Sequence, residues 1–299
     1  MRKVKRRSLL ADIRTNPVSY LMMTPFLALF FLFVVLPVAA SVCLSFTYYN
    51  MIQPPRFIFL ENYRRLFFED DVFRTAFKNT MIFAAITGPV SYFACLIFAW
   101  LLNELRPRVR AVATTLFYIP SMTSGVFIWR YVFANDARGL LNGWLMKLGF
   151  LDQPVLWLKD PKYTLGVIII VQLWMSLGVG FLVFIAGLQG IDRSLYESAA
   201  IDGIRNRWQE LYYITLPEMK PQLIFGAVLQ VANSFAVCDL SAQLAGNPSP
   251  MYSAHTLVLH MQDYGSVRYE MGYAMAVAVI LFVFTAGLTR IVMRFAEKG

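Results

Sequence analysis

Six long apolar runs constrain this chain more than any other feature of its sequence. The hydrocarbon core of a membrane is about 30 Å thick, and a helix needs about 20 mostly apolar residues to cross it. Hydrophobic residues make up 58% of the sequence and the mean hydropathy is +0.55, which is unlike a soluble globular protein. We therefore predict an all-α integral membrane protein with six transmembrane helices, at about residues 20–46, 77–102, 111–133, 163–188, 222–244 and 272–295.

The basic residues indicate how these helices are oriented. Residues 1–19 form a basic tail, and the apolar run after it is longer than the apolar region of a signal peptide, so we expect an uncleaved first span. Six spans place both termini on one side of the membrane. Lys and Arg are more numerous in the tail, the turn at 106–110, the loop at 190–217 and the C-terminus than in the other loops, which predicts that these segments are cytoplasmic. Residues 20–299 are predicted to form a single transmembrane domain.

The net charge of +9 is explained by these basic flanks, so no nucleic-acid partner is expected; the partner implied by the apolar runs is membrane lipid.

A charged stretch between the fourth and fifth runs has more order than a plain loop needs. Asp192 is a possible N-cap for a short helix, and Gly203 follows where that helix would stop, because glycine accepts left-handed backbone angles. Apolar residues then recur near helical spacing up to Pro217. We expect a second short helix there, with Asp202 as its cap, ended by Pro217, which can also occupy the first turn of the next helix. The stretch is predicted to be helix, glycine turn, helix.

This stretch resembles the EAA loop of the membrane subunits of binding-protein-dependent ABC importers. The family pattern is Glu-Ala-Ala, three residues, Gly, nine residues and Ile-x-Leu-Pro. Ser198 replaces the first alanine, and ten residues rather than nine separate the glycine from the isoleucine. The positions that match are Glu197, Ala199, Gly203, Ile214, Leu216 and Pro217.

The resemblance implies a type I importer fold in which different subunits have different tasks. In the family this loop is the coupling helix, which fits into a groove on the ATP-hydrolysing subunit. Glu197, Ala199, Asp202 and Gly203 are therefore expected to couple this chain to the ATPase. The implied partners are a second, similar but distinct permease subunit (a heterodimer), two ATPase subunits and an extracytoplasmic solute-binding protein, in a bacterial-type cytoplasmic membrane.

No cofactor is expected on this chain. It contains no GxxxxGK[ST] phosphate-binding loop, so ATP and Mg would be bound by the ATPase subunits.

Weaker matches extend the resemblance to the carbohydrate-type permeases of the same superfamily. They include Leu60–Tyr63, Gly139–Asn142, Gly187–Gln189 and Ser234–Asp239, and together they cover most of the chain from about residue 20 to residue 294. The turn at Gly246–Pro250 departs from the family's usual glycine run. The resemblance implies that the cargo is a sugar, more a di- or oligosaccharide than a monosaccharide. A glycerol phosphate-type solute is the alternative.

Polar residues inside the apolar runs are candidates for contact with a solute, because they are costly to place in a membrane. Neutral hydrogen-bonding groups beside aromatic rings suit uncharged, hydroxyl-rich solutes, whereas an anion is expected to meet cationic groups. Hydrogen bonding between helices explains each of these residues equally well. The candidates are Gln172 and Ser176 in the fourth run, Gln230 and Ser234 on one face of the fifth, and Asn233 next to that face.

An ion-coupled secondary transporter is the alternative class of protein. Such transporters usually need ionisable residues within the membrane, and Asp239 is the only obvious acid near a run. No HExxH, GxSxG or paired-cysteine pattern occurs, so no catalytic residue and no metal site is predicted, and the chain is not expected to be an enzyme. His255 and His260 are five residues apart and so do not share a helical face, which favours a surface or interface role over metal binding.

Overall fold

The computed structural model describes residues 17–122 and 126–298, and most of them are helical. Three of the six apolar runs are unbroken helices. The second run is α5 (Asp71–Asn103) and the sixth is α17 (Met271–Lys298). The first run continues from Pro17 to Leu44, as α2 (Pro17–Phe30), a π-helical turn η1 (Phe31–Val35) and α3 (Leu36–Leu44).

The fourth and fifth runs are each divided into two helices, and the third is described as two helices on either side of residues 123–125. The fourth is interrupted at Ser176–Gly178, where a glycine with non-helical backbone angles precedes the second helix. The fifth is bent by 41° between its two halves. The third contains residues 123–125, which lie outside the described residues. The pairs are α6 (Pro107–Met122) and α7 (Val126–Val132), α9 (Pro161–Met175) and α10 (Val179–Gln189), and α14 (Lys220–Phe235) and α15 (Asp239–Ala245).

The number of membrane spans is only partly confirmed by these helices. Among the described residues, four helical stretches are long and apolar enough to cross a membrane, and the bent pair α14–α15 would make a fifth. In the third run, α6 with 16 residues and α7 with 7 are each too short for this test on their own. The predicted total of six spans and the single-domain boundary at residue 20 therefore stay predictions.

Short elements connect the runs. An antiparallel hairpin pairs β1 (Thr47–Tyr48) with β2 (Arg56–Phe57), so that Thr47 lies opposite Phe57. The remaining short helices are α4 (Glu61–Phe68), α8 (Leu140–Lys147), η3 (Pro250–Tyr252), α16 (Leu257–Gln262) and η4 (Asp263–Val267), besides those of the 190–217 loop.

Two expectations about these connections have different outcomes. The helical spacing of Leu140, Leu141, Trp144, Leu145 and Leu148 predicts a short helix between the third and fourth runs, and the structure confirms it as α8. The Gly and Pro residues at the start of the segment 245–271 predict a loop, and this prediction is wrong for α16 and η4. Thr256 caps α16 by accepting the Leu259 N–H, and α16 packs against α17 in the core.

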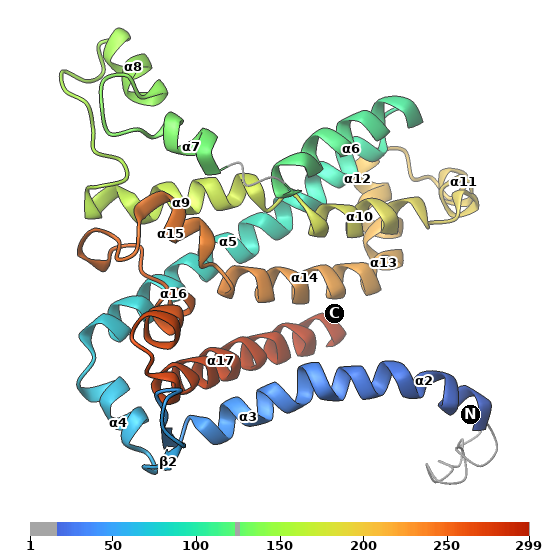
Figure 1. The fold of residues 1–299 in the computed structure, drawn as a ribbon. Coiled ribbons are helices and arrows are strands. Elements are labelled where there is room, and N and C mark those ends of the chain that lie inside the picture. The colour runs from blue at the N-terminus through green and yellow to red at the C-terminus, as the bar shows by residue number, and fades with distance from the viewer. Residues whose placement is uncertain (1–16, 123–125, 299) are drawn as a thin grey trace.

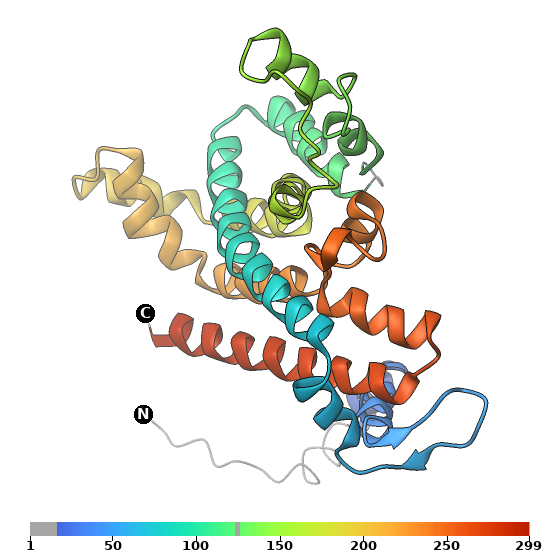
Figure 2. The same cartoon turned by 90° about the vertical axis from the view of Figure 1, so that its left-hand side faces the viewer.

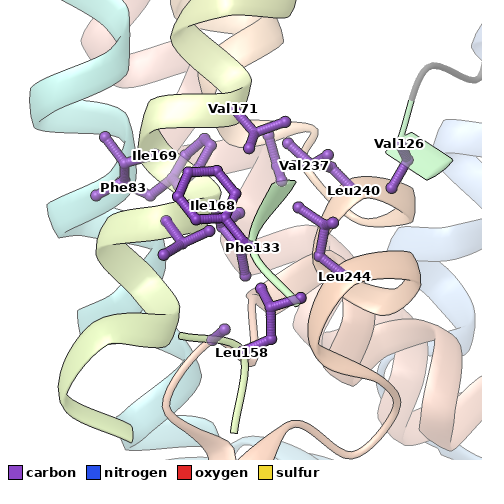
Figure 3. Close-up of a cluster of buried hydrophobic side chains, with 12 residues drawn as sticks. Phe83, Val126, Phe133, Leu158, Ile168, Ile169, Val171, Val237, Leu240 and Leu244 are labelled. Atoms are coloured by element: carbon purple, nitrogen blue, oxygen red, sulfur yellow. The ribbon is translucent and has the colours of Figure 1, made fainter. Parts of the chain in front are cut away.

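α5 lies at the centre of the packing. Three clusters of buried side chains follow one another along it: Phe73 packs with residues of α16 and α17, Phe83 with residues of α9 and α15, and Cys95 with residues of α10. Figure 3 shows the middle cluster, in which Phe83, Ile168 and Leu240 come from three different helices. One long helix therefore organises the core from end to end.

The elements separate into two ends of the molecule. α2 begins and α17 finishes toward the end where α11 of the 190–217 loop lies, whereas α4, α8, α15 and α16 lie at the other end (Figure 1). Figure 2 views the molecule from that second end. We call these the α11 end and the α16 end. The described helices thus begin and end toward the α11 end, and the prediction that both termini are cytoplasmic stays a prediction.

Candidate functional site

The loop at 190–217 begins as its sequence predicts. Asp192 caps α11 (Arg193–Ile201) by accepting a hydrogen bond from the Ser194 N–H at 3.0 Å. Gly203 then reverses the chain with a φ of +96°, and no heavy atom lies within 4 Å of the position that a Cβ would take there. The Ile204 N–H donates to the Ala199 carbonyl and closes the turn. The predicted helix and glycine turn are confirmed.

The second half of the loop differs from the prediction in two respects. Asn206, not Asp202, caps α12 (Arg207–Glu210), with its side chain accepting the Gln209 N–H at 2.8 Å. Asp202 instead closes the C-terminus of α11. Pro217 does lie in the first turn of α13 (Leu216–Glu218), but the helix is not interrupted before it. A π-helical turn, η2 (Leu211–Thr215), joins α12 to α13, and the chain redirects only at Met219, before α14.

Contacts with the end of α5 hold the loop in place. The Trp208 ring packs against Trp100 with ring centroids 5.0 Å apart. The Arg207 guanidinium lies 3.2 Å from a carboxylate oxygen of Glu104. Within the loop, the Tyr196 and Thr215 hydroxyls are 2.9 Å apart and join α11 to η2. Sequence reasoning missed the two contacts with α5 because they join segments about a hundred residues apart.

The predicted coupling residues lie at the surface of this loop, with one exception. Glu197 and Asp202 are exposed, as is Gly203. The Glu197 side chain lines a groove of about 560 Å³ between the loop and the α5–α6 turn, together with Arg110 and Arg193, and it forms no ion pair among the described residues. Ala199 is buried, so its small side chain permits close packing inside the loop itself.

The predicted pathway residues do not line one cavity in the described chain. Gln230 and Ser234 share a face, as predicted, but that face packs on α5: the Gln230 amide lies 3.6 Å from the Cys95 sulfur. Ser234 donates to the Val231 carbonyl at 2.9 Å. For these two residues the structure favours the helix-packing explanation.

The side chains of the other three candidates are less buried. Gln172 and Ser176 are half-buried at the break between α9 and α10, where the Ser176 hydroxyl donates to the Leu173 carbonyl at 2.8 Å. Asn233 is exposed beside the face of α14 that carries Gln230 and Ser234, as predicted, and its side-chain amide has no hydrogen-bond partner among the described residues.

A buried polar cluster at the α16 end was not predicted. Asp70 caps α5 by accepting the Phe73 N–H at 2.8 Å, and its second oxygen meets His260 at 3.2 Å and accepts the Tyr273 hydroxyl at 2.6 Å. Burial would raise the pKa of the Asp70 carboxyl, but these hydrogen bonds hold it well below its usual range. The cluster ties the start of α5 to α16 and α17.

The expectation that His255 and His260 lie at a surface or interface is wrong. Both side chains are buried, with ring centroids 5.5 Å apart, because α16 is folded into the core. Burial, reinforced by the nearby His260, lowers the pKa of His255 to about 4. The helical spacing of Leu257, His260 and Tyr264 is the sequence signal that could have predicted the burial of His260. Among the described residues, no group of three or more His, Cys, Asp or Glu side chains could hold a metal ion.

Comparison with known proteins identifies the family of the chain. Residues 92–298 match the family described as "Binding-protein-dependent transport system inner membrane component". The chain belongs to this family. The matched region of this inner membrane component contains the whole 190–217 loop and all five pathway candidates, whereas Asp70 precedes it.

Individual relatives of this inner membrane component are similar over almost their full length. The chain is 32% identical to the probable ABC transporter permease protein YesP of Bacillus subtilis, over 97% of this chain and 93% of the relative. It is 30% identical to the arabinooligosaccharides transport system permease protein AraP of the same organism, over 88% of the chain and 83% of the relative. The lactose transport system permease protein LacF of Rhizobium radiobacter is 29% identical, over 91% of both chains.

A solved structure shows the same fold. A chain from the crystal structure of a bacterial ABC transporter involved in the import of the acidic polysaccharide alginate superimposes with a TM-score of 0.78, at 22% identity, covering 97% of this chain and 98% of that chain. Family membership and the apolar helices make this inner membrane component a multi-pass protein of the cytoplasmic membrane. It is a transport component rather than a catalytic enzyme.

Proposed function

We propose that the protein is the permease subunit of an ATP-driven ABC importer that carries a sugar, and that the sugar is a di- or oligosaccharide. The observation that carries the proposal is the α11–Gly203–α12 loop, which is presented at the surface and held against the end of α5. The relatives support the cargo, since two of them are named for the transport of arabinooligosaccharides and of lactose.

In this proposal the two ends of the molecule meet different partners. Two ATPase subunits, which bind ATP and Mg, dock at the α11 end, where the exposed Glu197 carboxylate meets a basic group of the ATPase. A solute-binding protein docks at the α16 end. A second, similar but distinct permease chain completes the solute pathway, into which the exposed Asn233 amide projects.

An anionic solute such as a glycerol phosphate is the second candidate cargo. A groove of about 660 Å³ at the α16 end is lined by Arg130 and Lys159, which are both exposed and form no ion pair among the described residues. Cationic groups of this kind are suited to phosphate. The mid-depth residues of α9, α10 and α14 include no cation, which favours a neutral sugar.

Reconstitution tests the proposal. The chain is purified with its co-purifying subunits and placed in vesicles with the associated solute-binding protein, and uptake of disaccharides, oligosaccharides and glycerol phosphate is compared. We expect uptake of a sugar that requires internal ATP and survives ionophores that collapse ion gradients. Sugar uptake by this chain alone, driven by an ion gradient, would overturn it. Binding of only amino acids or peptides by the solute-binding protein would overturn the sugar assignment.

A further inference from the structure

An exposed apolar stripe runs along α8. Leu140 and Trp144 in α8 and Leu148 at its C-cap recur every four residues and so lie on one side of the helix, and they are 45%, 65% and 63% exposed. Phe150, just after the helix, is exposed as well. Lys147 lies in the last turn and is also exposed. No residue of the 190–217 loop and no pathway candidate belongs to this face of α8.

The opposite face of α8 is fixed to the rest of the chain by Asn142. Its side chain is fully buried, and its amide donates to the carbonyls of Ala134, Asp136 and Val155. Its oxygen accepts the Val155 N–H at 3.1 Å and the Trp157 indole N–H at 2.8 Å. Turning α8 to bury the stripe would break all five hydrogen bonds, so the stripe is held outward.

The position of α8 places this stripe beside the membrane. α8 lies at the α16 end and is joined to α9 by the segment 148–160, and both views show it at the rim of the molecule rather than over its centre (Figures 1 and 2). It packs against α7, whose Phe127, Ile128 and Tyr131 are also exposed. The apolar surface of α8 thus continues that of a helix in the third apolar run, in a protein of the cytoplasmic membrane.

We propose that α8 is an interfacial helix: Leu140, Trp144 and Leu148 enter the lipid at the α16 end of the membrane, and Lys147 reaches the headgroups. An amphipathic helix with a tryptophan on its apolar face and a lysine at its edge suits this interface. A large apolar stripe exposed to water is disfavoured. A solute-binding protein that leaves to collect solute would uncover the stripe in every cycle, whereas lipid covers it continuously. The proposal rests on the membrane location and not on the identity of the cargo.

The test measures the depth of α8 in the bilayer. Trp144→Cys and Leu148→Cys are each made in a full-length chain whose native cysteines are replaced, spin-labelled and reconstituted, with exposed Arg138→Cys as the matched control. We expect labels at 144 and 148 to be more accessible to oxygen, which concentrates in lipid, than to a water-soluble nickel chelate, and the label at 138 to show the reverse. Labels at 144 and 148 that behave like the one at 138 would overturn the proposal.

A second measurement keeps the native cysteines. A photoreactive benzoyl-phenylalanine replaces Trp144, and the crosslinked product is identified by mass. A phospholipid adduct, with or without the solute-binding protein present, is the expected result. Crosslinking to the solute-binding protein or to a second permease chain instead of lipid would assign the stripe to a protein interface and refute the inference.

Discussion

His255 lies fully buried near the start of α16, and neither of its ring nitrogens has a hydrogen-bond partner among the described residues. Burial first, and then His260, lowers its pKa from 6.5 to about 4. Between these values the unfolded chain binds a proton here and the folded chain does not. The stability that depends on neutral His255 is therefore complete above about pH 6.5 and is lost as the pH falls toward 4, by at most about 3 kcal/mol.

We expect the thermal unfolding midpoint of the detergent-purified protein to fall as the pH is lowered from about 7 to about 4.5, and His255→Leu to weaken this dependence. Asp70 does not contribute over this range, because its pKa is lowered and its stabilisation is lost only as the pH falls below its ordinary value of 3.8. Midpoints measured along a pH series in both proteins give the comparison. An equal decline in both would assign the effect to other groups.

Gly203 has a backbone conformation that only glycine and, at some cost, asparagine adopt readily, with φ at +96°. A Cβ at this position meets nothing, so Gly203→Val acts through the backbone alone, at about 1–3 kcal/mol. We expect normal membrane insertion with reduced transport and reduced solute-stimulated ATP hydrolysis, and partial recovery in Gly203→Asn.

Gly149 provides the matched control for this prediction. It also has a positive φ, of +75°, with open space around it, but it lies at the α16 end. Gly149→Val should therefore carry a similar backbone cost without uncoupling ATP hydrolysis from transport. If assembled Gly203→Val complexes still coupled ATP hydrolysis to transport normally, the glycine turn would have no role in the mechanism.

At the scale of elements, the packing of two tryptophan rings contributes more than an ion pair to the attachment of the 190–217 loop to α5. The Arg207–Glu104 pair is 65% and 36% exposed, and such pairs contribute at most about 1 kcal/mol. Trp208 is also 69% exposed, but its ring packs on the half-buried Trp100, and an aromatic contact adds about 0.5–1.5 kcal/mol beyond the area that it buries. We expect Trp208→Ala to increase hydrogen exchange across α12 and η2 more than Arg207→Gln does.

Hydrogen-exchange mass spectrometry of residues 204–218 measures this difference. Ile201→Ala serves as the control, because Ile201 is 87% exposed on the same loop and should leave the exchange rates unchanged. Equal protection in Trp208→Ala and in the unsubstituted protein would mean that the loop is held by its internal contacts alone, such as the Tyr196–Thr215 pair.

Elements with local signals could be predicted from the sequence, and those set by tertiary contacts could not. α11 and the Gly203 turn follow from a cap and a glycine within the same dozen residues. Helical spacing placed Gln230 and Ser234 on one face, but spacing alone does not reveal whether a face meets α5 or a solute pathway. The interruption at Ser176–Gly178 is invisible to hydropathy, since the residues around it remain apolar.

At the scale of the whole molecule, α5 connects the two ends. Its N-terminus is held in the Asp70 cluster with α16 and α17, and its C-terminus meets the 190–217 loop through Trp100 and Glu104. At 1.5 Å per residue, its 33 residues span roughly 50 Å. A shift of the loop at the α11 end therefore has an unbroken helix through which to reach the α16 end, which gives the proposed coupling a physical route.

Much of the membrane-facing surface is uncovered in the single chain. No residue of α2 is buried, and α14 exposes Phe225, Ala232 and Asn233. Apolar side chains such as Phe225 are stable against lipid, but the Asn233 amide is not, because lipid offers it no hydrogen bond. We therefore expect the Asn233 side of α14 to meet the second permease chain or the water-filled pathway between the two chains.

Asn233→Leu tests this expectation in the assembled transporter. Because the side chain is exposed and has no partner among the described residues, the substitution should leave the thermal stability of the isolated chain unchanged. Loss of a hydrogen bond between helices weakens their association by about 0.5–2 kcal/mol, so recovery of the second permease chain in co-purification, or solute uptake by the complex, should decrease. Phe225→Leu, at an exposed apolar position of the same helix, should change neither quantity. Unchanged assembly and uptake in Asn233→Leu would show that this side of α14 faces neither the partner nor the pathway.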